Sequence, residues 1–404
     1  MLKLSIFGIG RVGLPLSLVF AEKGCKVIGV DIDTAKITTL NEGKMPFMEE
    51  NAESLLRKHI QKNFVLTTDV KYAVQNSDFL ILTLGTPVDE HMNPVFSQIE
   101  NVITNILPYL KDGQTIILRS TISPGTMEYL RRFIEKHNNF KIGKNLFLAY
   151  CPERIVEGKA IEEIPQIPQI IGTLDKKSTL KCKEVFKALG NQMIFTDALS
   201  AELAKLFCNA YRYINFAIAN EFMMIAEQHG RDIYHIVDLV NKDYKRKGLK
   251  QPGFTAGPCL YKDGFFLVNK TPYTELISAS WKVNETVPAY LIEKIRAKKN
   301  LHGKKVVIMG LSFKKNIDDT RNSLSFKAKK IFIEEGADVF THDPYLESKK
   351  LETILKNADV VMIATNHDFY KEFGLEKIKR LVKPSAIICD VWNLFNTGKI
   401  IIEI

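Results

Sequence analysis

Near its start the chain reads Leu2-Lys3-Leu4-Ser5-Ile6-Phe7-Gly8-Ile9-Gly10-Arg11-Val12-Gly13, an apolar run followed by the pattern GxGxxG. Beyond it, the apolar spacing predicts a helix over 14–22 and a second buried strand over 27–30. In such a unit the first glycine permits the turn, the second lets a pyrophosphate approach the backbone, and the third lets helix and strand pack. The stretch therefore predicts an α/β fold with a doubly wound parallel sheet, which binds a dinucleotide at the start of the helix.

An acidic residue closes the second predicted strand. Asp31 lies 18 residues after Gly13. A carboxylate at this place accepts hydrogen bonds from the hydroxyls of the adenosine ribose, and its charge repels a 2′-phosphate. We therefore expect the cofactor to be NAD rather than NADP.

Further buried strands are predicted over 79–84, 115–118 and 145–150. In a doubly wound sheet, the residues just past the carboxyl ends of the strands line the ligand crevice. Four polar residues have this position, namely Thr86, Ser120, Thr121 and Glu153. Such residues also form turns and helix caps, so their position alone leaves both roles open.

A long helix is predicted over 199–230, because apolar residues recur at helical spacing and neither proline nor glycine occurs before Gly230. Such a helix can join two domains and offer a surface for dimerisation. Lys205 and Asn209 share one of its faces, and this face is either part of a site or solvated.

The last third of the chain repeats the alternation of strands and helices. Helices are predicted over 286–299 and 326–335, and strands over 304–309, 337–340, 359–364 and 385–390. This order predicts a second parallel sheet, whose first turn, at 310–315, lacks the GxGxxG pattern. We expect a dinucleotide-binding domain over 1–197, a helical domain over 198–300 and a second Rossmann-like domain over 301–404.

The predicted helical domain over 198–300 contains a cysteine in a loop. Cys259 follows Gly257 and Pro258, and Lys262 and Asp263 come three and four residues later. A thiol beside a cation can ionise and act as a nucleophile. Together with a dinucleotide, it suggests carbonyl oxidation through a thioester; an inert loop cysteine is the alternative.

Composition argues against several other classes of protein and of binding site. The chain has 404 residues, a net charge of +10 and six cysteines without a CxxC pair. Its lysines are spread out, and no basic run carries interleaved aromatic residues, so nucleic-acid binding is not expected. No apolar run reaches the roughly 18 residues of a membrane span, and no metal site is expected. The scattered cysteines favour a reducing, cytoplasmic setting.

Five motifs resemble, in order, those of the UDP-glucose/GDP-mannose dehydrogenase family, and together they cover essentially the whole chain. They are ST-x-x-PGT at 120–126, PE-x4-GKA at 152–160, E-x-x-K-x-x-x-N at 202–209, the catalytic GG-x-C-x-x-KD around 257–263, and FK…D-x-R at 313–321. The resemblance implies two Rossmann-like domains joined by a long helix through which subunits form a homodimer. It also implies oxidation of the C6 alcohol of a nucleotide sugar to the carboxylate with two NAD and one water, which supplies precursors of surface polysaccharides.

The resemblance also implies roles for single residues. Cys259 would add to the C6 aldehyde, Lys205 and Asn209 would stabilise the oxyanion, Asp263 and Thr121 would hold water, and Glu153 and Glu157 would transfer protons. The cofactor would contact Gly8, Gly10, Arg11, Val12, Gly13, Asp31, Lys36, Thr86, Thr121, Lys262 and Arg321. The UDP-sugar would contact Glu153, Arg154, Lys205, Asn209, Phe254, Gly257, Phe313 and Lys314, with Arg246 reaching across the dimer.

The identity of the sugar stays open at this point. Gly257-Pro258 replaces the usual double glycine, whereas Cys151-Pro152-Glu153-Arg154 and Gln251-Pro252-Gly253 look more like the branches that act on N-acetylated UDP-sugars. UDP-N-acetylmannosamine, UDP-glucose and UDP-N-acetylglucosamine are all compatible, with an N-acetylhexosamine favoured. Two rivals are a two-electron 3-hydroxyacid dehydrogenase, which needs neither the thiol nor 301–404, and a non-catalytic nucleotide-sugar sensor, which would not need Cys259, Lys205 and Asp263 together.

Overall fold

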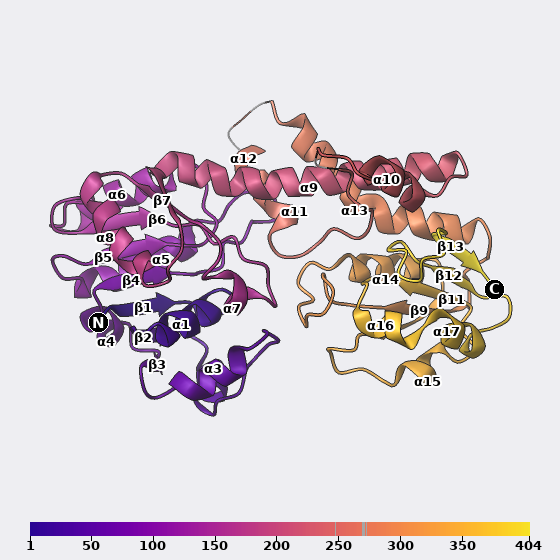
Figure 1. The fold of residues 1–404 in the computed structure, drawn as a ribbon, viewed down its shortest axis with the longest axis horizontal. Helices are drawn as coiled ribbons and strands as arrows, with labels where there is room; N and C mark the ends of the chain where they lie inside the picture. The colour runs from indigo at the N-terminus through magenta and orange to yellow at the C-terminus, as the bar shows by residue number, and fades with distance from the viewer. Residues whose placement is uncertain (247, 269–270, 272) are drawn as a thin grey trace. The chain divides into compact units, whose positions relative to one another are not determined.

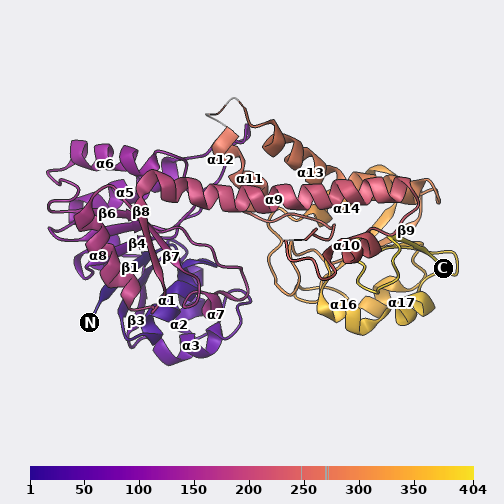
Figure 2. The same ribbon diagram turned by 45° about the horizontal axis from the view of Figure 1, so that its top comes forward.

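A computed structural model describes residues 1–246, 248–268, 271 and 273–404. The chain divides into two compact units, one formed by Met1–Cys208 with Phe265–Lys270 and the other by Asn209–Gly264 with Thr271–Ile404. The long helix α9 (Ala198–Gln228) contributes residues to both units (Figures 1 and 2). The finer division at 197/198 and 300/301 stays a prediction.

The first unit is built on an eight-stranded sheet in the order β3-β2-β1-β4-β5-β6-β7-β8. Its strands are β1 (Lys3–Phe7), β2 (Lys26–Val30), β3 (Phe64–Thr67), β4 (Phe79–Leu82), β5 (Thr115–Leu118), β6 (Phe147–Tyr150), β7 (Gln169–Thr173) and β8 (Met193–Asp197). All neighbours pair in parallel except β6 and β7. The carboxyl ends of β1, β2, β4, β5 and β6 therefore meet at one edge, where the ligand crevice is expected.

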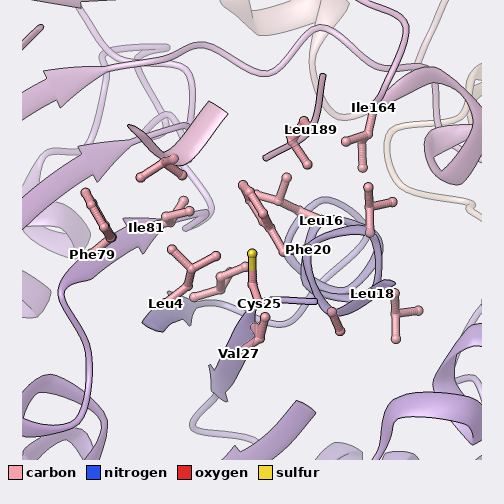
Figure 3. Packing of buried hydrophobic residues seen from close by; sticks show 14 of the residues in the cluster. Leu4, Leu16, Leu18, Phe20, Cys25, Val27, Phe79, Ile81, Ile164 and Leu189 are labelled. Atoms are coloured by element: carbon pink, nitrogen blue, oxygen red, sulfur yellow. The ribbon is translucent and has the colours of Figure 1, made fainter. Parts of the chain in front are cut away.

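Helices cover both faces of this sheet. They are α1 (Gly13–Glu22), α2 (Thr34–Asn41), α3 (Ala52–His59), α4 (Val70–Gln75), α5 (Ser97–Ile106), α6 (Thr126–His137), α7 (Ala160–Glu163) and α8 (Lys176–Lys187). Burial on both faces explains why the central strands β4, β5 and β6 read as continuous apolar runs. On one face, Leu4, Val27 and Ile81 of the strands gather with Leu16 and Phe20 of α1, all at most 1% exposed (Figure 3).

The second unit contains a five-stranded sheet in the order β10-β9-β11-β12-β13. Its strands are β9 (Lys305–Met309), β10 (Asp338–His342), β11 (Val360–Ile363), β12 (Ile387–Cys389) and β13 (Ile401–Glu403), parallel except for the last pair. The helices of this unit beyond α9 are α10 (Ile233–Asn241), α11 (Leu260–Asp263), α13 (Glu275–Arg296), α14 (Leu324–Glu334), α15 (Leu351–Leu355), α16 (Asp368–Phe373) and α17 (Leu375–Leu381). The short α12 (Phe265–Val268) belongs to the first unit.

The predicted α/β fold with two parallel-dominated sheets and a long helix is confirmed. The alternation did not predict the antiparallel pair that each sheet contains. The helix predicted over 286–299 was placed wrongly, since α13 begins at Glu275 and continues through Pro288. The buried side of α13 includes the polar residues Ser280 and Asn284, which interrupt the apolar spacing on which the prediction relied.

Among the helices of the described residues, none is both long and apolar enough to cross a membrane.

Candidate active site

The three glycines of the first turn have different surroundings. Gly8 adopts a φ of +94°, and a Cβ added there would lie 2.8 Å from the carbonyl oxygen of Thr83. A Cβ on Gly13 would lie 2.0 Å from the carbonyl oxygen of Gly8, so helix and strand approach there too closely for a side chain. Around the Cβ position of Gly10, the described part of the chain places no heavy atom within 4 Å. The backbone at Gly10 is therefore approachable, as a bound pyrophosphate requires.

The start of α1 suits an anion. Val12 is its N-cap residue, and no side chain of the described residues caps the helix, so its first N–H groups and its dipole can serve a phosphate. The guanidinium of Arg11 lies 4.8 Å from the ring centre of Phe47. This places a cation next to the turn in which Gly10 is open.

Asp31 lies beside the same turn. Its Oδ2 accepts hydrogen bonds from the Ile9 amide and from Lys36 Nζ, both at 2.9 Å, and its Oδ1 accepts one from the Asp33 amide at 3.0 Å. The residue is 8% exposed. The predicted group of turn, helix start and strand-end carboxylate is thus brought together within the first unit, and these residues fit a dinucleotide.

Two loops at the same edge of the sheet are joined by hydrogen bonds. Ser120 Oγ, after β5, donates to the carbonyl oxygen of Leu84, after β4, at 2.6 Å. Thr86 and Thr121, which are predicted to contact the cofactor, are half-buried in these loops. The polar residues at the strand ends therefore lie at neighbouring positions, as the parallel pairing of β4 and β5 requires.

Glu202 of α9 holds the loop that follows Thr121. This carboxylate is 1% exposed and accepts hydrogen bonds from the amides of Gly125 at 2.6 Å and Met127 at 2.8 Å, at the start of α6. Burial raises the pKa of Glu202, and the two amides oppose that rise. Lys205, one turn later on α9, is also buried, at 9% exposure. Glu202 thus ties the Thr121 loop to the helix that carries Lys205.

Glu153, after β6, forms a buried ion pair with Arg119, after β5. Arg119 is 1% exposed; its Nε donates to Glu153 Oε2 at 2.8 Å, and its second terminal nitrogen also contacts that oxygen. The remaining amino group donates to the Cys151 carbonyl oxygen at 3.3 Å and to Gln169 Oε1 at 2.9 Å. This charged pair fixes the start of the loop after β6.

The other oxygen of Glu153 holds the next part of that loop. Glu153 Oε1 accepts hydrogen bonds from the amides of Arg154 at 2.8 Å and Ile155 at 3.2 Å. The Arg154 guanidinium in turn donates to the carbonyl oxygen of Pro168, and Glu157 is half-buried in the same loop. These contacts make Glu153 a residue that fixes the loop; its role in proton transfer stays a prediction.

In the second unit, the loop that leads to Cys259 is anchored at its beginning. The amide of Gly253 donates to Asn220 Oδ1 at 2.9 Å, and Asn220 Nδ2 donates to Asn284 Oδ1 at 2.9 Å. Both asparagines are fully buried. Gly253 has a φ of +154°, and a Cβ there would lie 2.3 Å from the Trp392 ring, so glycine is required. Phe254, predicted to line the sugar pocket, is buried at 6% exposure.

The end of this loop packs on a second loop of the same unit. Gly257 has a φ of +102°, and a Cβ there would lie 2.5 Å from the Phe313 ring. Its amide donates to the Asn322 carbonyl oxygen at 3.3 Å. Two residues later Cys259 is exposed, as is Cys208; the other four cysteines are buried. The structure therefore brings together Gly257 and Phe313, two predicted substrate contacts.

A buried carboxylate follows the exposed thiol by one turn. Asp263 is fully buried; its Oδ2 accepts a hydrogen bond from Asn209 Nδ2 at 2.6 Å, and Lys262 Nζ lies 3.7 Å from its Oδ1. The amides of Lys262 and Asp263 donate to the Cys259 carbonyl oxygen at 3.2 Å and 3.0 Å. Three predicted catalytic residues, Cys259, Asp263 and Asn209, are thus linked within the second unit.

The remaining predicted residues lie at two places in the second unit. Lys314 is half-buried next to Phe313, and Arg321 is bound to Asp319 through its Nε and its backbone amide, each at 3.0 Å. Arg246 is exposed, and its predicted reach across a dimer stays a prediction.

Sequence reasoning missed Arg119, Glu202 as a cap, and Asn220. The available signal was weak, namely a charged or amide residue placed within or directly after an apolar run. Their partners, Glu153, Gly125 and Gly253, lie between 33 and 77 residues away in the chain, so spacing could not indicate the pairing.

Comparison with protein-family models gives three matches, all to the UDP-glucose/GDP-mannose dehydrogenase family. Its NAD-binding domain matches residues 2–190, its central domain matches 199–286 and its UDP-binding domain matches 307–397.

Individual relatives cover nearly the whole chain. A UDP-N-acetyl-D-mannosamine dehydrogenase from Methanocaldococcus jannaschii is 32% identical over 98% of this chain and 93% of that relative. Among solved structures, the UDP-D-ManNAc dehydrogenase from Pyrococcus horikoshii has a TM-score of 0.92 at 29% identity, over 97% of this chain and 96% of that chain. The UDP-N-acetyl-mannosamine dehydrogenase from Staphylococcus aureus has a TM-score of 0.86 at 30% identity, over 97% and 95%.

Proposed function

This chain belongs to the UDP-glucose/GDP-mannose dehydrogenase family and is an NAD-dependent nucleotide-sugar dehydrogenase, and from that premise we propose that it oxidises UDP-N-acetylmannosamine at C6 to the uronic acid through a thioester on Cys259. The sugar is supported by the names of the relatives above, which are UDP-N-acetylmannosamine dehydrogenases. The covalent route is supported by the exposed residue Cys259, which lies one turn before the buried carboxylate of Asp263.

The residues of the first unit would hold the cofactor. Gly10 leaves its backbone approachable, α1 offers its first N–H groups, and Asp31 would accept the ribose hydroxyls after exchange with its present partners. Two molecules of NAD, bound one after the other, would each accept one hydride, one in each of the two oxidation steps.

Residues of the chain would form and cleave the covalent bond to C6 of the sugar and stabilise the charges that develop there. The Cys259 thiolate adds to the C6 aldehyde and forms a thiohemiacetal, so that the aldehyde cannot escape between the two oxidations. Loss of the second hydride leaves a thioester, and water cleaves its C–S bond to release the carboxylate and the thiol. Lys205 and Asn209 would stabilise the negative oxygen. Asp263, which Asn209 holds in place at 2.6 Å, would orient the water.

The reaction has a stoichiometry that tests it directly. We expect two NADH for each UDP-N-acetylmannosamine consumed, and a product whose mass is that of the uronic acid. UDP-glucose, UDP-N-acetylglucosamine and GDP-mannose serve as comparison substrates under the same conditions. One NADH for each sugar and a ketone product would replace the proposal with a two-electron oxidation, and tight NAD binding without turnover of any sugar would favour a sensor.

We also propose that two copies of the chain associate through α9. Within the second unit, Tyr211, Ile218, Phe222 and Ile225 of this helix are between 40% and 60% exposed, and their spacing places them along one face. A contiguous exposed apolar face of this kind is typical of a protein interface. Light scattering should give a mass of about twice the chain mass of 45.9 kDa. Phe222→Glu should lower this measured mass toward that of a single chain. A wild-type protein that stays at the single-chain mass at micromolar concentration would contradict the dimer.

A further inference from the structure

The second sheet has a strand-end carboxylate in the position that Asp31 has in the first. Asp343 follows β10 as Asp31 follows β2, and both reach back to the amides of the turn after the neighbouring strand. Asp31 keeps 8% exposure and an ammonium partner on the surface, whereas Asp343 is fully buried. The same position in the fold is thus used differently in the two sheets.

Both carboxylate oxygens of Asp343 accept hydrogen bonds from groups of the surrounding loops. Its Oδ2 accepts from the amides of Leu311 at 2.7 Å and Ser312 at 2.9 Å, from Ser312 Oγ at 2.9 Å and from His367 Nε2 at 3.1 Å. Its Oδ1 accepts from the Tyr345 amide at 3.0 Å. Burial opposes ionisation of this carboxyl, but the hydrogen bond from His367 and those from the amides keep the pKa of Asp343 below its ordinary value. A carboxylate used in this way is not available to a ribose and instead fixes the loops around it.

His367 extends this network to the loop that carries Phe313 and Lys314. The backbone amide of Asn316 donates to His367 Nδ1 at 2.9 Å. Because a backbone amide can only donate, Nδ1 carries a lone pair, and the ring proton of the neutral imidazole lies on Nε2, facing Asp343. His367 therefore connects Asp343 to Asn316 with one nitrogen for each.

Asn316 is held by its backbone conformation and by several hydrogen bonds. Its φ is +58°, a left-handed conformation that asparagine tolerates better than most residues. Besides its bond to His367, its Oδ1 accepts from the Asp368 amide at 3.1 Å and the Tyr345 hydroxyl at 3.2 Å, and its Nδ2 donates to Asp368 Oδ2. Two residues before it stands Lys314, and three before it Phe313, whose ring contacts the backbone of Gly257.

We propose that His367 is a positioning residue for the nucleotide sugar, which acts by holding Asn316 and thereby the loop 311–321 in the conformation that binds substrate. The proposal rests on the proposed function, in which Phe313 and Lys314 contact the UDP-sugar. The alternative role of His367 is only to satisfy the buried Asp343, with no effect of its own on substrate binding.

Two isosteric substitutions separate these roles. The side-chain amide of asparagine reaches about as far as Nδ1, and that of glutamine about as far as Nε2. His367→Asn can therefore keep an acceptor for the Asn316 amide while losing the donor to Asp343, and His367→Gln does the reverse. If His367 positions the loop, His367→Gln should raise the KM for the UDP-sugar about tenfold, the effect of one hydrogen bond to a binding loop. His367→Asn should raise that KM at most about twofold.

The controls distinguish positioning from loss of structure. The KM for NAD should change less than the KM for the UDP-sugar in both variants, since the glycine turn and Asp31 belong to the other unit and Arg321 is the one residue of this loop that is predicted to contact the cofactor. The midpoint temperature of thermal unfolding should be lowered more by His367→Asn than by His367→Gln, because His367→Asn removes a hydrogen-bond donor from the buried Asp343. Tyr345→Phe, which removes one bond to Asn316 and leaves the pair of Asp343 and His367 intact, should raise the KM for the UDP-sugar about threefold and serves if a His367 variant fails to fold.

The proposal is overturned if the KM for the UDP-sugar follows thermal stability, with His367→Asn the worse variant, or if Tyr345→Phe binds like wild type. Its failure is distinct from failure of the proposed function. If wild-type protein turns over the UDP-sugar and Lys314→Ala weakens its binding while all three loop-anchor variants behave like wild type, the function stands and only the positioning role is lost.

Discussion

Replacement of Cys259 by serine is expected to abolish formation of the uronic acid, with a fall in kcat of at least about 10³-fold. A serine hydroxyl is hardly ionised near neutral pH, and it cannot replace a thiolate in addition to the aldehyde or as the leaving group of a thioester. NAD affinity should change little, because the glycine turn and Asp31 belong to the other unit and the substitution leaves Lys262 and Arg321 in place. The measurement is steady-state NADH formation, with the product identified by mass.

Cys208→Ser is the matched control for this experiment, because Cys208 and Cys259 are the two exposed cysteines. Cys208→Ser should keep wild-type turnover and lose only one modifiable thiol. A Cys259→Ser protein that still forms two NADH and the uronic acid at the wild-type rate would exclude the covalent route and make Cys259 a structural residue.

The second large effect is expected at the buried ion pair of the first unit. Arg119→Met should lower the free energy of unfolding by about 3–5 kcal/mol, because it leaves the carboxylate of Glu153 buried without its charged partner. It also removes the donors that serve Gln169 and the Cys151 carbonyl oxygen. Urea-induced unfolding measures the change, and activity should fall with it, since Glu153 fixes the loop that carries Arg154 and Glu157.

A double-mutant cycle with Glu153→Gln measures the interaction energy between Arg119 and Glu153 separately from the contacts that each makes with other residues. The double variant should lose less stability than the two single losses added together, by about 1–3 kcal/mol, because neither buried charge is then left alone. Arg131→Met is the surface control: Arg131 pairs with Glu128 at about one-third exposure, and its loss should cost at most about 1 kcal/mol. If Arg119→Met is no more destabilising than Arg131→Met, the pair does not stabilise the unit.

The features that could be predicted from the sequence are formed by residues that lie close together in the chain. Gly8, Gly10, Gly13 and Asp31 lie within one strand–turn–helix–strand unit, and their spacing was enough to place the turn, the open glycine and the carboxylate. The long helix was predicted for the same reason, since its apolar spacing is uninterrupted.

What could not be predicted depends on partners that are distant in the chain. Arg119 meets Glu153 only because β5 and β6 pair in parallel and end at the same edge. Asn284 looks like a break in an apolar face until Asn220 and Gly253 are seen beside it. The catalytic roles inferred from resemblance remain predictions, because geometry places these side chains but does not show their chemistry.

The open surroundings of Gly10 have a consequence for the stability of the chain. Gly8 and Gly13 cannot vary without distorting the fold, since backbone atoms already occupy the space of a side chain. Gly10 does not have a positive φ in the structure and has room for a methyl group. Alanine there would even make the protein more stable, by about 0.4–1 kcal/mol, through a less flexible unfolded chain. A requirement for glycine at this position would therefore come from the bound ligand, and the chain is slightly less stable than it could be while its backbone stays within reach of a phosphate.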